Sequence, residues 1–253
     1  VIGQRSYGKG LVQQTFNLPY NSLVKVTVAK YYTPSGRCIQ ALDYAHKDEN
    51  GAAEKFADST MRAFNTKAGR TVYDGNGIFP DILITPTTYS PITIALVSKN
   101  LYFDYANAYK KAHPIIANIK DFRLSDTDYA AFTNSIAQKD YSYTSNSERL
   151  LAELKAEANK ENKADAVKID LQALGEKMVN AKKNDLTTHK NEIKRMLETQ
   201  IVGRYAFEKG KIEHSFQYDK EIARANELFN NKTQILSILN GTGSYKFIGT
   251  VNK

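Results

Sequence analysis

The spacing of apolar residues changes near Ser90, and this change constrains the fold more than any other feature of the chain. Before Ser90, short stretches of β-branched and aromatic residues alternate with turn residues, which is typical of strands. After Ser90, apolar residues recur every three or four positions, which is typical of helices that pack along one face. The sequence therefore predicts an α+β protein with a β-rich domain over residues 1–90 and an all-helical domain, ending in a polar tail, over residues 91–253.

The β-rich part is predicted to contain several short strands. The predicted strands cover residues 1–3, 12–18, 23–32, 70–73 and 79–84. Pro80 cannot donate a backbone hydrogen bond, so the last of these strands is expected near a sheet edge. Thr33, Pro34, Ser35 and Gly36 predict a turn after the long strand, since proline and glycine stand at its second and fourth positions. Residues 43–70 are rich in polar residues and alanine, and we expect them to form an exposed insertion.

The helical part contains four apolar stripes and two start signals. A stripe that begins at Ile94 and ends near His113 and Pro114 predicts one helix. Two pairs of residues have the spacing of capping boxes, Ser125 with Asp128 and Ser145 with Glu148. The other stripes are Val167, Leu171, Leu174 and Met178; Ile193, Met196, Leu197, Ile201 and Tyr205; and Ile222, Ala225, Phe229, Leu236 and Leu239.

Lys9 is the strongest candidate for a chemical role, because glycines stand on both sides of it and Gln13 follows four residues later. Glycine allows unusual backbone dihedrals and a close approach of another segment. A lysine that becomes buried there has a lowered pKa, and its neutral amine can act as a general base. Gln13 has the donors and the acceptor that would orient the amine. The Gly-Lys-Gly pattern alone leaves a second interpretation open, a surface lysine in a flexible turn.

The supporting role of Gln13 implies a particular backbone path. Four residues of extended strand span about 13 Å, whereas the same residues in a helical turn share one face. We therefore expect residues 9–13 to be coiled or folded back at Gly10 if Gln13 positions the amine of Lys9.

Ser6 stands three residues before Lys9, as the nucleophile does in the S-x-x-K pattern of β-lactamases. That pattern requires both side chains on one helical face, and Gly8 and Gly10 disfavour a helix. The companion S-D-N and K-T-G patterns are also missing from the sequence. We do not predict Ser6 as the nucleophile.

Three blocks in a fixed order carry a family resemblance. Their sequences are Gly-Gln-Arg-Ser-Tyr-Gly-Lys-Gly-Leu-Val-Gln over residues 3–13, Ala-Lys-Tyr-Tyr-Thr-Pro-Ser-Gly-Arg-Cys-Ile-Gln over 29–40, and Asp-Gly-Asn-Gly-Ile-Phe-Pro-Asp over 74–81. This order closely resembles the carboxyl-terminal processing peptidases, also called tail-specific proteases. The helical part is similar to the C-terminal extension of the Bacteroides-type members of that family.

The resemblance implies a serine endopeptidase that acts on protein or peptide substrates near their C-termini. In that family a serine and a lysine form the catalytic dyad, so the roles that carry over are general base for Lys9 and support of that base for Gln13. The family's serine lies well upstream of its lysine, and a peptide-binding PDZ domain precedes it. We therefore expect this chain to be a C-terminal fragment that lacks both and is inactive alone. The resemblance further implies that no cofactor is used and that the protein lies in the periplasm or cell envelope.

Two other functions remain as alternatives. An inactive family member would act as a peptide-binding or scaffolding protein, and the presence or absence of the upstream serine would distinguish it from the enzyme. A basic nucleic-acid-binding module would need clustered basic residues with stacking aromatics. The net charge of +8 is instead spread over the chain, with +3 in residues 1–90 and +5 in residues 91–253, and no nucleic-acid partner is predicted.

Other candidate sites are weak. His46, His113, His189 and His214 have no companions at metal-binding spacing, so no metal site is predicted. Cys38 is expected to be a packing residue. Unpaired strand edges in the β-rich part invite pairing with another chain, so we expect a homodimer through this half.

Overall fold

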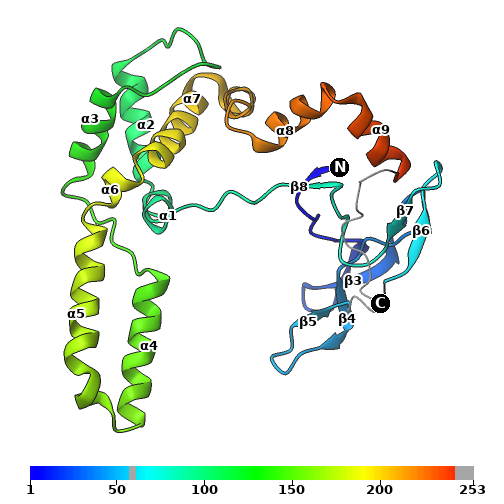
Figure 1. Cartoon of the computed structure of the whole chain (residues 1–253), viewed down its shortest axis with the longest axis horizontal. Helices are drawn as coiled ribbons and strands as arrows, with labels where there is room; N and C mark the ends of the chain where they lie inside the picture. Colours follow the sequence, from blue (N-terminus) through cyan, green and yellow to red (C-terminus); the bar gives the residue numbers. More distant parts are fainter. Residues whose placement is uncertain (57–60, 243–253) are drawn as a thin grey trace. The chain divides into compact units, whose positions relative to one another are not determined.

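The computed structural model describes residues 1–56 and 61–242, and the chain divides into two compact units. The first, named the β unit here, consists of Val1–Pro86 and the residues from Asp219 onward. The second, named the helical unit, is Thr87–Tyr218. Strands and helices are both present, which confirms the α+β class (Figure 1). The predicted boundary at residue 90 lies close to the end of Val1–Pro86, but helices that follow Tyr218 group with the strands. The structure describes the chain up to Thr242, so most of the predicted tail lies outside the described residues.

The β unit is built from four small two-stranded sheets. Its strands are β1 (Ile2–Gly3), β2 (Leu11–Leu18), β3 (Ser22–Lys30), β4 (Leu42–Lys47), β5 (Ala53–Lys55), β6 (Ala63–Asn65), β7 (Thr71–Tyr73) and β8 (Ile82–Leu83). β1 and β8 pair in parallel, and the other three sheets are antiparallel pairs of consecutive strands. The predicted strands are thus present, although the last one is reduced to β8. The predicted turn is also confirmed, because the Gly36 N–H donates to the Thr33 carbonyl at 2.8 Å.

Residues 43–70, which we expect to form an exposed insertion, are mostly exposed where the structure describes their side chains, and they contain β4, β5 and β6. The polar residues between β4 and β5 form a tight turn. The Asp48 carboxylate accepts hydrogen bonds from the N–H groups of Asn50 (2.9 Å) and Ala52 (2.8 Å), and the Gly51 N–H donates to the Asp48 carbonyl. An aspartate that accepts from the N–H groups that follow it stabilises a turn, and this turn connects β4 to β5.

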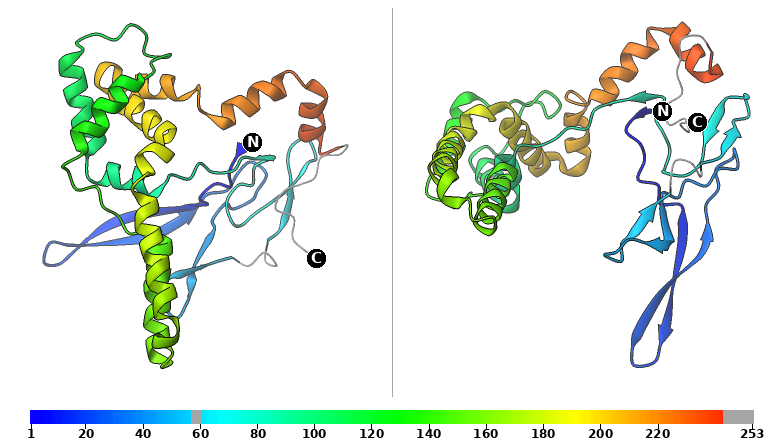
Figure 2. Two further views of the ribbon diagram at one scale, coloured as in Figure 1. Left: turned by 60° about the vertical axis from the view of Figure 1, so that its left-hand side comes forward. Right: turned by 60° about the horizontal axis from the view of Figure 1, so that its bottom comes forward.

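The β2–β3 ribbon extends away from the other strands of its unit (Figure 2). Its turn has positive φ at Tyr20 (62°) and Asn21 (56°), as the favoured two-residue hairpin turns require. Because Phe16 pairs with Val24 and Gln14 with Val26, one face of the ribbon is largely apolar. Its apolar residues are Phe16, Leu18, Val24, Val26 and Val28, and four of them are 42–47% exposed.

The helical unit contains α1 (Pro91–Ser98), α2 (Leu101–Ala112), α3 (Asp126–Ile136), α4 (Asn146–Lys160), α5 (Ala164–Lys182), α6 (Asp185–Thr188) and α7 (Lys190–Ser215). Its core comes mainly from α1, α2, α3 and α7: Ile92, Leu96, Leu101, Tyr102, Ala106, Leu124, Tyr129, Phe132, Ile136, Ile193, Leu197 and Ile201. α4 and α5 form an antiparallel pair that extends from this core (Figure 1). No helix among the described residues is long and apolar enough to cross a membrane.

The single helix predicted from Ile94 to His113 is two helices. Asn100 adopts a left-handed conformation (φ 58°) between α1 and α2, which asparagine tolerates better than most residues. The stripe continues across the break because both helices face the same core, so apolar spacing alone does not reveal the break.

Both predicted capping boxes are confirmed. The Ser125 hydroxyl accepts from the Asp128 N–H at 3.0 Å, and the Ser145 hydroxyl accepts from the Glu148 N–H at 3.2 Å. Each carboxylate in turn accepts from the backbone N–H of its serine.

Two helices at the C-terminal end, α8 (Lys220–Phe229) and α9 (Lys232–Asn240), belong to the β unit. The Gln4 amide donates to Glu221 of α8 at 3.4 Å, and Arg70 donates to the Ile238 carbonyl of α9 at 3.2 Å. These helices therefore pack beside β1 and the segment that precedes β7.

Candidate active site

The three sequence blocks that carry the family resemblance meet around Lys9. The Ala41 N–H donates to the Gly8 carbonyl at 2.8 Å, and the Tyr31 N–H donates to the Gly10 carbonyl at 2.8 Å. The third block joins through Ser6, whose N–H donates to the Ile78 carbonyl at 3.0 Å. Residues far apart in the sequence thus fix the backbone on both sides of Lys9.

Gly8 and Gly10 are required for this close approach. Gly8 has φ +78°, and a Cβ there would lie 2.5 Å from the Ala41 Cβ and 2.9 Å from the Gly77 nitrogen. A Cβ on Gly10 would lie 2.8 Å from the Gln40 nitrogen. The sequence predicts the unusual dihedral, which is present at Gly8, and the nearby segment, which is present at both glycines.

Gln40 is a positioning residue that the sequence alone does not reveal. Its side chain is 6% exposed, its Oε1 accepts from the Gly10 N–H at 2.7 Å, and its Nε2 donates to the Leu42 carbonyl at 2.9 Å. A buried amide with both ends bonded holds the two segments at a fixed separation. Its position at the end of the second block is the only sequence signal for this role.

The Lys9 side chain is exposed while both neighbouring glycines are buried. Within the described residues its ammonium group has no hydrogen-bond or ion-pair partner. The backbone is therefore held in place, and the amine extends into solvent.

Gln13 lies in β2, with its side chain exposed and paired across the ribbon with Thr27. The expectation that residues 9–13 are coiled is wrong from Leu11 onward, because Leu11 and Val12 pair with Lys30 and Ala29 of β3. The strand register shifts between Val12 and Gln13, so the ribbon is irregular at this point. Among the described residues no bond joins the side chains of Lys9 and Gln13, and the catalytic roles of both stay predictions.

Ser6 has a structural role. Residues 4–10 form no helix, so Ser6 and Lys9 do not share a helical face. The Ser6 Oγ instead accepts from the Ile78 N–H at 2.8 Å.

A charged cluster joins the second and third blocks and consists of Arg37, Asp81 and Arg70, which directly precedes β7. Arg70 donates to Asp81 at 2.7 Å, and both side chains are largely buried. Burial, and then the like charge of Arg70, lower the pKa of Arg37, while Asp81 acts in the opposite direction. The carboxylate thus stabilises two neighbouring guanidinium groups.

The remaining candidates are dispersed. Cys38 is half-buried and forms an isolated bridge with Tyr32 across the turn. His46 contacts Asp43 at 2.7 Å on the surface. Over residues 1–56 and 61–242, no group of three or more metal-ligating side chains is present.

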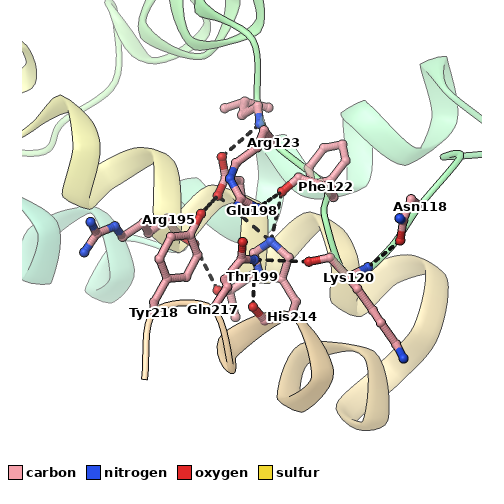
Figure 3. A network of polar contacts seen from close by, with 11 residues as sticks. Asn118, Lys120, Phe122, Arg123, Arg195, Glu198, Thr199, His214, Gln217 and Tyr218 are labelled. Carbon is pink, nitrogen blue, oxygen red and sulfur yellow. Dashed lines mark hydrogen bonds and ion pairs between the residues drawn. The ribbon is translucent and has the colours of Figure 1, made fainter. Parts of the chain in front are cut away.

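A buried polar cluster lies in the helical unit (Figure 3). Glu198 is 2% exposed and accepts from the Leu124 N–H at 2.9 Å and the Tyr218 hydroxyl at 2.8 Å. His214 is fully buried, and its Nε2 lies 3.0 Å from the Phe122 carbonyl, which can accept only from a protonated nitrogen. Burial, and then Glu198, raise the pKa of Tyr218 to about 12. Both oxygens of Glu198 are used within the protein, so this cluster stabilises the fold.

Three distant blocks join around a solvent-facing lysine, and comparison with known proteins shows that the chain is similar to carboxy-terminal-processing proteases over part of its length. Residues 92–229, more than half of the chain, match the family described as "Probable PDZ-protease, C-terminal helical domain", and the chain belongs to this family. Residues 1–46 match "Peptidase family S41".

One curated relative is the "Carboxy-terminal-processing protease" of Bartonella bacilliformis. It is 48% identical over 42 residues, which is 17% of this chain and 10% of that protein. The match thus spans about a tenth of the length of the relative. No solved structure matches the chain.

Proposed function

We propose that this chain supplies the general base of a serine endopeptidase that cleaves proteins near their C-termini. Lys9 is the base and Gln13 supports it. The single observation that carries the proposal is the fixed backbone around Lys9, where three distant blocks join and the amine remains without a partner in the described residues. A general base must be held in a fixed position, and its amine must be available to the serine hydroxyl.

The proposed reaction passes through an acyl-enzyme. Neutral Lys9 accepts the proton of a serine hydroxyl as its Oγ attacks the peptide carbonyl carbon, and the lysine then gives this proton to the departing amine. Water hydrolyses the ester in the second half of the reaction, with Lys9 again acting as the base. Ser6, the serine nearest to Lys9 in the sequence, uses its Oγ to accept from Ile78, so we do not assign the attack to it.

The test uses the complete gene product that contains these residues and an unstructured peptide as substrate. Lys9→Ala should abolish cleavage without changing the circular dichroism spectrum. Lys25→Ala, which removes another exposed lysine on β3, should leave the rate unchanged. Metal chelators should have no effect on the wild type.

A folded Lys9→Ala variant that still cleaves would remove Lys9 from the mechanism. We also propose that residues 1–253 alone are inactive, and turnover by this pure chain would contradict that statement. Binding of the peptide without cleavage by the complete wild-type protein would favour the alternative of a peptide-binding or scaffolding protein.

We propose a periplasmic or cell-envelope location on the basis of the family resemblance. Fractionation of cells that express the complete gene product, followed by immunoblotting, tests this. Recovery in the cytosolic fraction alone would contradict it.

A further inference from the structure

Three asparagines in the chain are followed directly by glycine, namely Asn50, Asn76 and Asn240. Asparagine is one of the thermolabile residues of proteins. A glycine after it increases this lability, because no side chain hinders the approach of the glycine nitrogen to the asparagine side-chain amide. The sequence does not distinguish the three pairs, but the structure places each of them in a different environment.

The first pair, Asn50 and Gly51, lies in the exposed turn between β4 and β5. Apart from the chain neighbours of Gly51, no described atom lies within 4 Å of the position that a Cβ of this residue would occupy. Within the described residues the Asn50 side chain has no hydrogen-bond partner. The Gly51 N–H donates to the Asp48 carbonyl at 2.9 Å. A bond within a surface turn opens at little cost, so the Gly51 nitrogen becomes available while the strands stay paired.

The second pair is held inside the β unit. Asn76 is 4% exposed, and its Nδ2 donates to the Phe56 carbonyl at 2.9 Å. The Gly77 N–H donates to the Ile39 carbonyl at 3.1 Å, and a Cβ on Gly77 would lie 2.3 Å from the Ser6 carbonyl oxygen. Separate segments therefore hold both groups that would have to react. Their release requires these segments to come apart, which is opening on the scale of the whole unit.

The third pair lies at the end of a helix. Asn240 is exposed and is the last residue of α9, and the Gly241 N–H donates to the Ile238 carbonyl at 3.3 Å. The helical backbone directs this N–H to a carbonyl of the preceding turn, while the Asn240 side chain projects away from the helix axis. We expect Asn240 to react more slowly than Asn50.

We propose that Asn50 is a site of spontaneous deamidation in the turn between β4 and β5. The Gly51 nitrogen attacks the side-chain amide carbon of Asn50, a C–N bond forms, and ammonia leaves with the proton of that nitrogen. The product is a cyclic succinimide. Water then adds to either carbonyl of the ring and opens it, which gives aspartate in one case and isoaspartate in the other. The reaction needs only water, and the inference does not rest on the proposed peptidase function.

Both products change the turn. The new carboxylate stands beside Asp48 and Glu49, so a third negative charge joins two others. Isoaspartate also adds one carbon atom to the backbone between the N–H groups of Asn50 and Ala52, which both donate to the Asp48 carboxylate. Repulsion and the longer backbone weaken these bonds, so the β4–β5 pair should open more often after deamidation.

The test incubates the whole 253-residue chain in mildly alkaline buffer and analyses samples by brief tryptic digestion and mass spectrometry. Cleavage after lysine and arginine places the three asparagines in separate peptides, residues 48–55, 71–99 and 233–246. Peptide 48–55 should gain the mass of one amide-to-acid conversion at least about tenfold faster than peptide 71–99, because a folded unit opens far more rarely than a surface turn. Peptide 233–246 should convert at an intermediate rate.

The chain unfolded in guanidinium chloride is the control for intrinsic reactivity, since peptides 48–55 and 71–99 should then convert at similar rates. Asn50→Gln should abolish the mass gain of peptide 48–55, because the larger ring that glutamine would form closes far more slowly. Asn17→Gln is the matched variant, since Asn17 is also exposed but is followed by Leu18, and it should leave the conversion unchanged.

A folded chain whose peptide 48–55 stays unconverted, over a period in which the unfolded chain converts, would overturn the proposal. Equal conversion of peptides 48–55 and 71–99 in the folded chain would overturn the selection of Asn50 by the structure. Amide hydrogen exchange in β5 should be faster in the converted chain, and unchanged exchange there would overturn the effect on the turn.

Discussion

The Gly10 N–H donates to the Gln40 Oε1 at 2.7 Å, and this buried bond joins two blocks that are 30 positions apart in the sequence. It fixes the residue that directly follows Lys9. The position of the Lys9 backbone thus depends on the side-chain amide of Gln40.

Gln40→Leu should lower the free energy of unfolding by about 1–3 kcal/mol, because the buried Gly10 N–H and Leu42 carbonyl lose their partner. Urea unfolding followed by circular dichroism measures the change. Gln138→Leu is the control, since its side chain is exposed and the change should be close to zero. Equal effects of the two substitutions would contradict the role assigned to Gln40.

Gly8→Ala should destabilise the chain by several kcal/mol more than Gly51→Ala. Both glycines have almost the same positive φ, +78° and +79°, so the backbone strain of alanine is matched. Only at Gly8 would the new Cβ lie 2.5 Å from another atom, whereas nothing lies within 4 Å at Gly51. The difference in urea midpoint between the two variants measures the cost of the steric contact at Gly8. Similar midpoints would show that the segment at Ala41 can move away from Gly8 without loss of stability.

The helical unit should lose stability as the pH rises from 10 towards 12, partly through Tyr218. Its pKa is raised from 10.0 to about 12 in the folded protein, so the unfolded chain loses this proton first. The contribution of Tyr218 to the free energy of unfolding is therefore fully present below pH 10 and is lost as the pH rises from 10 to 12. Tyr218→Phe should be less stable at neutral pH, because Glu198 loses a donor, and its alkaline decline should be shallower. Thermal unfolding across this range tests the prediction, and identical slopes for both proteins would refute it.

We predict a homodimer through the β unit, and the apolar face of the β2–β3 ribbon identifies a surface for it. This face carries Phe16, Leu18 and Val26 with 42–47% exposure, and a two-stranded ribbon is marginally stable without a covering layer. Val26→Lys should convert the dimer to a monomer in sedimentation equilibrium. Thr27→Lys adds the same charge to the opposite face and should leave the dimer intact. A wild-type chain that is monomeric at high concentration would contradict the prediction.

Features set by nearby residues could be predicted from the sequence. Ser125 with Asp128 form a capping box within a single turn of chain, and the glycines beside Lys9 signal an unusual backbone. Features set by distant residues could not. Gln40 acts on Gly10, and Glu198 binds Leu124 and Tyr218, so their roles depend on contacts that no local pattern encodes. Asn100 illustrates a third case, because a left-handed residue interrupts a helix without interrupting its apolar stripe.

The interruption of α7 at Ala206 and Phe207 has a mechanical consequence. Phe207 has φ 53° and ψ −153°, a conformation that is unfavourable for a residue with a side chain. In a straight helix Glu198 and His214 would lie about 24 Å apart, yet here the His214 Nε2 is 4.0 Å from the Glu198 carboxylate.

The bend therefore brings the two parts of α7 to the same buried cluster. The bonds of Tyr218 to Glu198 and of His214 to the Phe122 carbonyl hold the end of α7 against the preceding segment. Amide hydrogen exchange in the final turns of α7 should therefore become faster when either bond is removed.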